Sequence, residues 1–201
     1  LDVDSVIYPR IAYPTYLVGA MIAKARPIEV DIDASQWPAA DLAWVNSPSN
    51  PTGRIHSEDE LRAVIDYARR NNAIIASDEC YLNFPAGDIA PISILKVAAG
   101  DNTNLLAVHS LSKRSNLAGY RAAFIVGDPK VVATIREVRK HAGFMVPLPV
   151  QRAMTAALAD ETHAHAQAEK YRARRSVLRA ALEAAGFAVE FTDAGLYIWC
   201  T

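Results

Sequence analysis

The sequence predicts an α/β fold in which a mainly parallel sheet is covered by helices on both faces. Three continuous apolar runs, Leu42–Val45, Ala73–Ala76 and Leu105–Val108, are typical of strands that are buried on both sides. Between the first two runs, apolar residues recur at helical spacing from Leu61 to Ala68. Strands that alternate with amphipathic helices in this way favour a parallel sheet between two layers of helices.

The elements of the N-terminal half follow from simple patterns. Val6–Tyr8 is a short apolar run, Leu17–Ala25 is rich in small and apolar residues like a helix, and Pro27–Ile32 alternates like a half-buried strand. Ser57 and Glu60 have the spacing of a capping box, which predicts that a helix begins there.

The C-terminal half continues the pattern and then changes character. Ala122–Val126 is predicted to be another buried strand. Helical spacing predicts four helices, near Ile92–Leu95, from Val131 to Ala142, through Met154 and Leu158, and from about Glu161 to Ala185, before Gly186. Phe187–Phe191 and Leu196–Cys200 are predicted to be strands. We therefore expect a large domain in residues 1–160, then a connecting helix and the start of a smaller α+β domain in residues 161–201.

Both ends of the sequence suggest an internal piece of a longer protein. The chain begins at Leu1, without a methionine, and reaches an apolar strand pattern almost at once. It stops at Thr201, directly after a predicted strand. We expect that segments on both sides belong to the same protein.

Composition narrows the class of protein. The 201 residues carry a formal net charge of −1, which does not indicate a nucleic-acid partner, and no apolar run is long enough to span a membrane. Cys80 and Cys200 do not make a disulfide framework, so we expect a cytoplasmic protein. No metal site is expected, because His163 and His165 face different sides of a helix.

Polar clusters directly follow three of the predicted strands. They are Asn46–Gly53, Ser77–Tyr81 and Ser110–Lys113. In a parallel sheet, ligands bind beyond the carboxyl ends of the strands. We therefore expect these clusters to converge on one site.

The stretch Ser110–Arg121 has the residue types that a phosphorylated carbonyl compound requires. The hydroxyls of Ser110 and Ser112 and the guanidinium of Arg121 are suited to a phosphate group. Lys113 lies between them and has an amine that can bond covalently to a carbonyl. Taken alone, the stretch is equally consistent with a polar surface loop.

The other clusters supply groups for a flat aromatic cofactor. Asp78, at the end of an apolar strand, is suited to a pyridinium nitrogen, although a helix cap or buried ion pair is the ordinary alternative. Tyr81 and Asn50 are suited to a phenolic oxygen of the ring, and Tyr13 is suited to stacking on it. Packing in the core is the alternative for either tyrosine, and Asn50 also belongs to a common turn sequence.

Four motifs in order resemble the aspartate-aminotransferase-like family of fold-type I pyridoxal-phosphate enzymes. They are Pro9–Tyr16, Asn50-Pro-Thr-Gly53, Asp78-Glu-Cys-Tyr81, and Ser110-x-Ser-Lys113 with Arg121 eight residues later. The resemblance covers essentially the whole chain. It implies that residues 1–160 form the large cofactor-binding domain and that the protein is a homodimer.

The resemblance implies a role for each matching residue in binding pyridoxal 5'-phosphate. Lys113 would be the Schiff-base lysine and proton shuttle, and Asp78 would pair with the pyridine nitrogen. Asn50 and Tyr81 would hydrogen-bond the ring hydroxyl, and Asn50 would also lie close to the substrate carboxylate. Tyr13 would stack on the ring.

The phosphate contacts implied by the resemblance are those of Ser110, Ser112 and Arg121. Arg114 departs from the small hydroxylated residue that the family often has there. Relatives also have a glycine-rich phosphate loop before Tyr13 and a C-terminal arginine for the substrate carboxylate, and the present sequence contains neither.

The implied reaction is transamination between an amino acid and 2-oxoglutarate. The stretch Val138–Gln151 looks like bacterial succinyldiaminopimelate aminotransferases of lysine biosynthesis, which implies N-succinyl-diaminopimelate as the amino donor. Two alternatives stay open: the same cofactor residues serve carbon–sulfur lyases, and the same domain occurs in transcriptional regulators.

Overall fold

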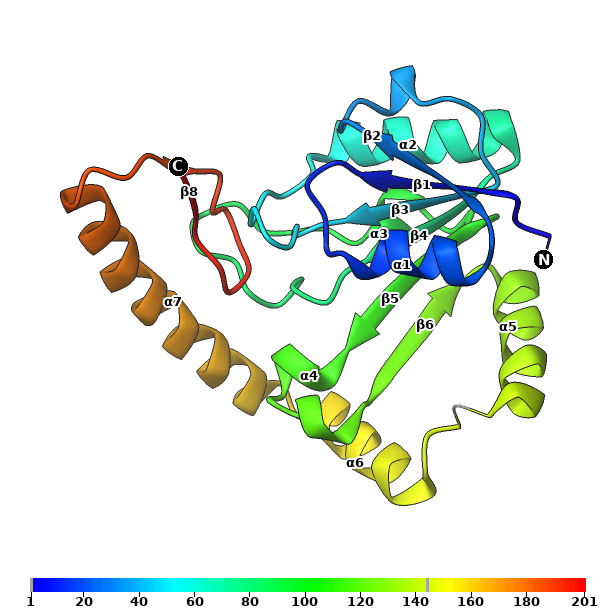
Figure 1. The fold of residues 1–201 in the computed structure, drawn as a ribbon. Coiled ribbons are helices and arrows are strands. Elements are labelled where there is room, and N and C mark those ends of the chain that lie inside the picture. Colours follow the sequence, from blue (N-terminus) through cyan, green and yellow to red (C-terminus); the bar gives the residue numbers. More distant parts are fainter. Residues whose placement is uncertain (1, 144) are drawn as a thin grey trace.

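The computed structural model describes residues 2–143 and 145–201 and contains one large sheet and one small sheet (Figure 1). The elements are, in chain order, β1 (Ser5–Pro9), α1 (Thr15–Ile22), β2 (Arg26–Val30), η1 (Ala34–Gln36), β3 (Leu42–Asn46), α2 (Glu58–Asn71), β4 (Ile74–Asp78), α3 (Ile94–Val97), β5 (Leu105–Ser110), α4 (Leu111–Arg114), η2 (Ala118–Tyr120), β6 (Ala123–Gly127), α5 (Pro129–Ala142), α6 (Leu148–Ala159), α7 (Glu161–Ala184), β7 (Val189–Glu190) and β8 (Trp199–Cys200).

The large sheet has the strand order β2-β1-β3-β4-β5-β6. The first five strands are parallel, and β6 is antiparallel to β5. The predicted α/β fold with a mainly parallel sheet is therefore confirmed. Because the first five strands run in one direction, their carboxyl ends all lie at one edge of the sheet.

Helices cover both faces of the large sheet, as predicted (Figure 1). On one face, residues such as Ile7, Ile75 and Leu105 pack with α2 and α3. On the other face, α1 packs over Val6, and α5 packs over Leu106. Neighbouring residues of one strand thus point to opposite faces, which explains why these strands are apolar throughout.

Helix α2 begins as its sequence predicts. The hydroxyl of Ser57 accepts a hydrogen bond from the backbone N–H of Glu60, and the carboxylate of Glu60 accepts one from the backbone N–H of Ser57. Leu61, Val64 and Ile65 are buried on the face that packs against the sheet.

The prediction that Ala122–Val126 is a fully buried strand is wrong. Strand β6 lies at the edge of the sheet and runs antiparallel, and Val126 is 41% exposed. Its apolar sequence resembles that of the central strands, but an edge strand is paired on one side only.

The two C-terminal strands are shorter than predicted. Of Phe187–Phe191 only Val189–Glu190 is a strand, and of Leu196–Cys200 only Trp199–Cys200. Phe191 and Thr192 have left-handed backbone conformations, with φ of 57° and 64°, which end the first strand. The chain then turns back, and the backbone N–H of Thr192 donates to the carbonyl of Thr52.

Helix α7 carries a basic run, Lys170–Arg175, that its sequence predicts to be a solvated face. Arg175 is an exception, because it is 7% exposed and its Nη2 donates to the carbonyl of Thr192 at 2.9 Å. This arginine therefore joins α7 to the segment that contacts Thr52.

Candidate active site

The carboxyl ends of β3, β4 and β5 bring three of the predicted clusters to one edge of the sheet. Asn46 pairs with Asp78 in the β3–β4 register, and Asp78 pairs with Val108 in the β4–β5 register. Ser110 ends β5 and leads directly into α4, which contains Lys113. The parallel topology therefore places these clusters side by side, as the sequence predicts.

The carboxylate of Asp78 is held by two hydrogen bonds. Its Oδ2 accepts from the hydroxyl of Tyr16 at 2.7 Å, and its Oδ1 accepts from the backbone N–H of Cys80 at 3.1 Å. A carboxylate has about four acceptor positions, so Asp78 retains the capacity to accept a further hydrogen bond.

Tyr16 is a site residue that the sequence reasoning missed. It is 4% exposed, and its ring stacks on Trp44 with centroids 4.9 Å apart. Burial, followed by the negative charge of Asp78, raises the pKa of Tyr16, so its hydroxyl remains a donor. The sequence feature that could have indicated Tyr16 is its position three residues after Tyr13, in the same Pro- and Tyr-rich turn.

Replacing Tyr16 by phenylalanine in the complete protein is expected to lower kcat roughly tenfold to a hundredfold, because a hydrogen bond to a charged group contributes about 1.5–3 kcal/mol. The ring keeps its contact with Trp44, so the fold is retained. Steady-state kinetics measure the effect. Tyr67→Phe is the matched control, since the hydroxyl of Tyr67 donates to the carbonyl of Pro38. Equal losses in both variants would contradict a specific role for Tyr16.

The loop Asn46–Gly53 is organised by the side chain of Asn46. Its Oδ1 accepts from the backbone N–H of Asn50 at 2.7 Å, and its Nδ2 donates to the carbonyls of Pro48 and Asp78. The peptide bonds Ser47–Pro48 and Asn50–Pro51 are cis. Asn46 thus ties the backbone of Asn50 to the end of β4.

The close packing of this loop requires a glycine at position 53. Its φ is +73°, and a Cβ there would lie 2.6 Å from the carbonyl oxygen of Ala194. The backbone N–H of Ala194 also donates to the carbonyl of Gly53 at 2.9 Å. The C-terminal segment is therefore in direct contact with the loop that carries Asn50.

The two predicted phosphate-binding serines lie together at the start of α4. The Oγ of Ser110 accepts from the backbone N–H of Ser112 at 3.1 Å, and the two hydroxyls are 2.8 Å apart. The side-chain amine of Lys113 forms no hydrogen bond or ion pair with another residue of the described ranges. Burial raises the pKa of the Cys80 thiol, and the positive charge of Lys113 acts in the opposite direction without reversing the shift.

Arg121 is not brought into hydrogen-bonding contact with the two serines. It is exposed and has a left-handed conformation with φ of 52°, and its Nη1 donates to the carbonyl of Ala118 at 2.9 Å. Its predicted role in binding phosphate therefore stays a prediction.

The two predicted ring-binding tyrosines differ in exposure. Tyr13 is 48% exposed and lies edge-on to Tyr16, with centroids 6.1 Å apart. Tyr81 is 5% exposed and lies near Tyr197. Burial, followed by hydrogen bonding to Tyr197, raises the pKa of Tyr81. Tyr13 is thus accessible to a ligand, while the phenol of Tyr81 is a neutral group.

Arg114, which departs from the expected residue type, has a structural contact. It is 8% exposed and donates through Nη1 to the carbonyl of Ala157 and through Nη2 to Glu161, at 2.9 and 2.6 Å. It therefore joins α4 to the start of α7.

This set of groups fits pyridoxal phosphate in its chemistry. Lys113 offers an amine without a partner among the described residues, Asp78 offers a remaining acceptor position, and Ser110 and Ser112 offer hydroxyls. Within residues 2–143 and 145–201 there is no group of three His, Cys, Asp or Glu side chains that could hold a metal ion.

Comparison with known proteins identifies the family. The model of the family described as aminotransferase class I and II matches residues 2–201. The chain belongs to this family. Aminotransferases of class I and II depend on pyridoxal phosphate, which agrees with the predicted cofactor. Among the described residues, no helix is both long enough and apolar enough to cross a membrane.

Two curated aminotransferases are similar over 98% of the chain. A probable aminotransferase of Mycobacterium tuberculosis is 53% identical, and the match covers 48% of that protein. The 4-dedimethylamino-4-oxo-anhydrotetracycline transaminase of Streptomyces rimosus is 48% identical, and the match covers 56% of it. The chain therefore spans about half the length of these aminotransferases.

Solved aminotransferase structures have the same fold. An aminotransferase from Neisseria meningitidis is 29% identical, with a TM-score of 0.87 over 98% of this chain and 53% of that one. A probable N-succinyldiaminopimelate aminotransferase from Thermus thermophilus is 26% identical, with a TM-score of 0.89 over 98% and 56% of the two chains.

Proposed function

We propose that the protein containing this chain transfers an amino group between an amino acid and a 2-oxo acid, with 2-oxoglutarate as the acceptor. The observation that carries the proposal is the position of Lys113, whose side-chain amine has no hydrogen-bond or ion-pair partner among the described residues and which follows the strand next to Asp78. An amine and a carboxylate at adjacent strand ends are the two groups that this chemistry requires of the protein.

Lys113 is the proposed catalytic base and acid. When bound, pyridoxal phosphate supplies an aldehyde for the amino group and a ring that withdraws electrons from the α-carbon. The amine of Lys113 removes the proton from the α-carbon of the substrate and returns it later.

The other predicted residues are proposed to bind and orient. Asp78 accepts a hydrogen bond from the ring nitrogen and keeps that nitrogen protonated, and Asn50 and Tyr81 donate to the ring oxygen. Tyr13 packs on the ring face. Ser110, Ser112 and Arg121 are the proposed phosphate contacts, and the amide of Asn50 also lies toward the substrate carboxylate.

The amino donor that we propose is N-succinyl-diaminopimelate, as the likeness to succinyldiaminopimelate aminotransferases suggests. The 26% identical Thermus thermophilus protein has this name, and a protein of Aquifex aeolicus named LL-diaminopimelate aminotransferase is 31% identical. The two relatives that are 53% and 48% identical have other names. We also propose a cytoplasmic homodimer, in which residues 161–201 begin the smaller domain.

A screen of amino donors with the complete protein, pyridoxal phosphate and 2-oxoglutarate tests the function. We expect glutamate to form with N-succinyl-diaminopimelate, and LL-diaminopimelate and cystathionine serve as comparison donors. Release of pyruvate and ammonia from cystathionine, without glutamate, would indicate a carbon–sulfur lyase. Absence of glutamate with every donor would contradict the proposed transferase.

A further inference from the structure

The helical turn that carries Lys113 is too short to be stable by itself. Helix α4 is the single turn Leu111–Arg114, and one hydrogen-bonded turn does not compensate for the entropy lost in fixing its backbone. At its start, the backbone N–H of Leu111 donates to the carbonyl of Ala122 at 3.1 Å. Since the amine of Lys113 has no partner of its own among the described residues, its placement depends on what holds the other end of the turn.

Arg114, the residue after Lys113, holds the end of α4 against two other helices, which lie next to it in Figure 1. Its Nη1 donates to the carbonyl of Ala157 in α6, and its Nη2 donates to the carboxylate of Glu161 in α7. The side chain is 9% exposed. Because a guanidinium has its donors in a rigid, planar fork, two bonds from different nitrogens fix its position.

A second link to α7 runs through Ser115, the C-cap residue of α4. The Oγ of Ser115 is 2.9 Å from Nε2 of His163, and Nδ1 of His163 is 2.9 Å from Oδ2 of Asp160. Asp160 is the N-cap residue of α7, where its Oδ1 accepts from the backbone N–H of Thr162 at 2.8 Å. The Nη1 of Arg114 lies 3.4 Å from the same Oγ of Ser115. These four side chains, from Arg114 to Asp160, form one hydrogen-bond network between the end of α4 and the start of α7.

The bonds of His163 define which of its nitrogens carries the proton. The hydrogen bond from His163 is the largest cause that lowers the pKa of Asp160, so this carboxylate is ionised near pH 7. An ionised carboxylate only accepts, and Nδ1 of His163 is therefore the donor. In the neutral ring, Nε2 is then an acceptor for the hydroxyl of Ser115. Every donor from Ser115 to Asp160 thus has an acceptor.

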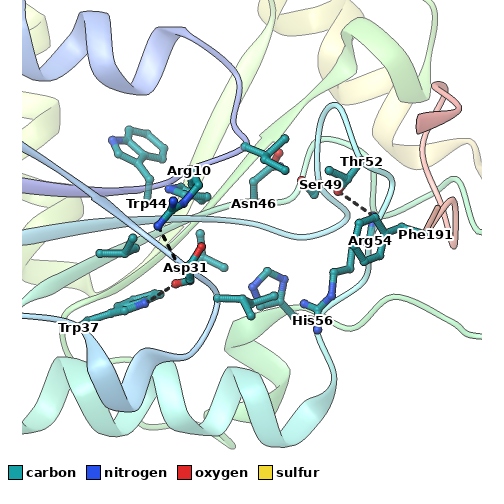
Figure 2. A pocket seen from close by; sticks show the side chains of 15 residues that line it. Arg10, Asp31, Trp37, Trp44, Asn46, Ser49, Thr52, Arg54, His56 and Phe191 are labelled. Atoms are coloured by element: carbon teal, nitrogen blue, oxygen red, sulfur yellow. Dashed lines mark hydrogen bonds and ion pairs between the residues drawn. The ribbon is translucent and has the colours of Figure 1, made fainter. Parts of the chain in front are cut away.

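The network lies apart from a cavity at the carboxyl ends of β1, β2 and β3, which Figure 2 shows from close by. The cavity has a volume of about 350 Å³, and Asn46, Arg54 and Phe191 are among the residues that line it. None of the described residues that line it belongs to α4, α6 or α7. Replacing a residue of the network therefore leaves the walls of this cavity in place.

We propose that Arg114, Ser115 and His163 are positioning residues, which hold α4 so that the amine of Lys113 is placed to join the aldehyde of pyridoxal phosphate. Joining forms a carbon–nitrogen double bond and releases the aldehyde oxygen as water. The inference rests on the proposed function, because Lys113 is the proposed base and acid. A misplacement of about 1 Å can lower a rate about 10²-fold, so a small shift of α4 is sufficient.

Two replacements of His163 separate its two bonds. His163→Gln keeps a polar atom near the position of Nε2, and with it the bond to Ser115, whereas His163→Asn keeps one near Nδ1, and with it the bond to Asp160. Pyridoxal phosphate is added to the complete protein after removal of its cofactor, and the appearance of visible absorbance is timed. The rate is expected to fall about tenfold in His163→Asn and to stay within about threefold of the parent in His163→Gln.

The order of the two variants is decisive. A residue that only stabilises the start of α7 would give the opposite order, because only the asparagine keeps the bond to Asp160, and that result would overturn the proposal. His165→Asn, at an exposed position of the same helix, is the control and is expected to leave the rate unchanged. Thermal unfolding of each variant shows whether stability has changed.

Replacements in α4 test the network from its other end. Ser115→Ala is expected to slow the reaction with the cofactor about tenfold, and the double variant Ser115→Ala/His163→Asn no more than about twofold further, since both changes remove the same bond. Arg114→Lys loses the rigid fork and is expected to slow it about tenfold. Arg152→Lys, at an exposed position of α6, is the control. Losses that multiply in the double variant would overturn the Ser115–His163 link.

Steady-state kinetics extend the test to the reaction itself. In His163→Asn, kcat is expected to fall about tenfold while KM stays within about twofold, because the amine acts in the chemical step. Parent rates of absorbance appearance in both His163→Asn and Ser115→Ala would overturn the positioning role and leave transamination intact. Slowed absorbance in the variants, with no glutamate from any donor in the parent, would overturn the proposed function alone. A parent protein that develops no visible absorbance would overturn both.

Discussion

Replacing Lys113 by alanine in the complete protein is expected to lower kcat by at least roughly 10³-fold. The variant loses both the amine that bonds to the cofactor aldehyde and the group that moves the α-proton, and general acid–base catalysis alone contributes about 10²–10⁴. The visible absorbance of a cofactor joined to the lysine is expected to disappear. Absorbance spectra and glutamate formation measure the two effects separately.

Lys170→Ala is the matched control for this experiment, because Lys170 is exposed on α7 and α7 is a helix in which alanine is well tolerated. It is expected to retain full activity and the parent spectrum. A small primary amine added to Lys113→Ala is expected to restore part of the activity, since it can carry the proton. An unchanged visible spectrum in Lys113→Ala would refute the assignment.

Replacing Asp78 by asparagine is expected to lower kcat roughly 10²- to 5 × 10³-fold. Asparagine is nearly the same size, so it removes the negative charge and leaves the packing in place. Loss of one partner of a buried charge pair costs about 3–5 kcal/mol, and each 1.36 kcal/mol of barrier corresponds to a factor of ten in rate. The loss is expected mainly in kcat and less in KM. The negative charge of Asp78 keeps the ring nitrogen protonated, and the protonated ring withdraws electrons during the reaction.

Asp88→Asn provides the comparison, since Asp88 is an exposed residue of the loop between β4 and α3. Kinetics and thermal unfolding of both variants separate catalysis from stability. If Asp78→Asn keeps at least half of the parent kcat, Asp78 is a structural residue that only holds Tyr16 and Cys80.

The sequence predicts correctly that the polar clusters lie together, because this prediction depends only on the direction of the strands. Asn46, Asp78 and Ser110 end parallel strands, so they had to lie at one edge whatever their side-chain rotamers. The position of Arg121 could not be obtained in this way. Its backbone is left-handed, and no local pattern indicates that a non-glycine residue adopts this conformation.

Tyr16 and β6 show a second limit of sequence patterns. Tyr16 has the sequence features of a core aromatic residue and indeed stacks on Trp44, but its hydroxyl reaches a residue 62 positions later. Strand β6 is as apolar as the central strands, yet it is at the edge. In both cases the deciding factor is which element lies next to the residue, and this depends on the order of strands in the sheet.

The Asn50 loop is not free to move independently of the C-terminal segment. Thr192 and Ala194 donate backbone hydrogen bonds to Thr52 and Gly53, and Arg175 of α7 holds the carbonyl of Thr192. A sideways shift of α7 relative to the sheet must either break these bonds or carry the loop with it. The position of the long helix and the backbone conformation beside Asn50 are therefore coupled through Arg175 and Thr192.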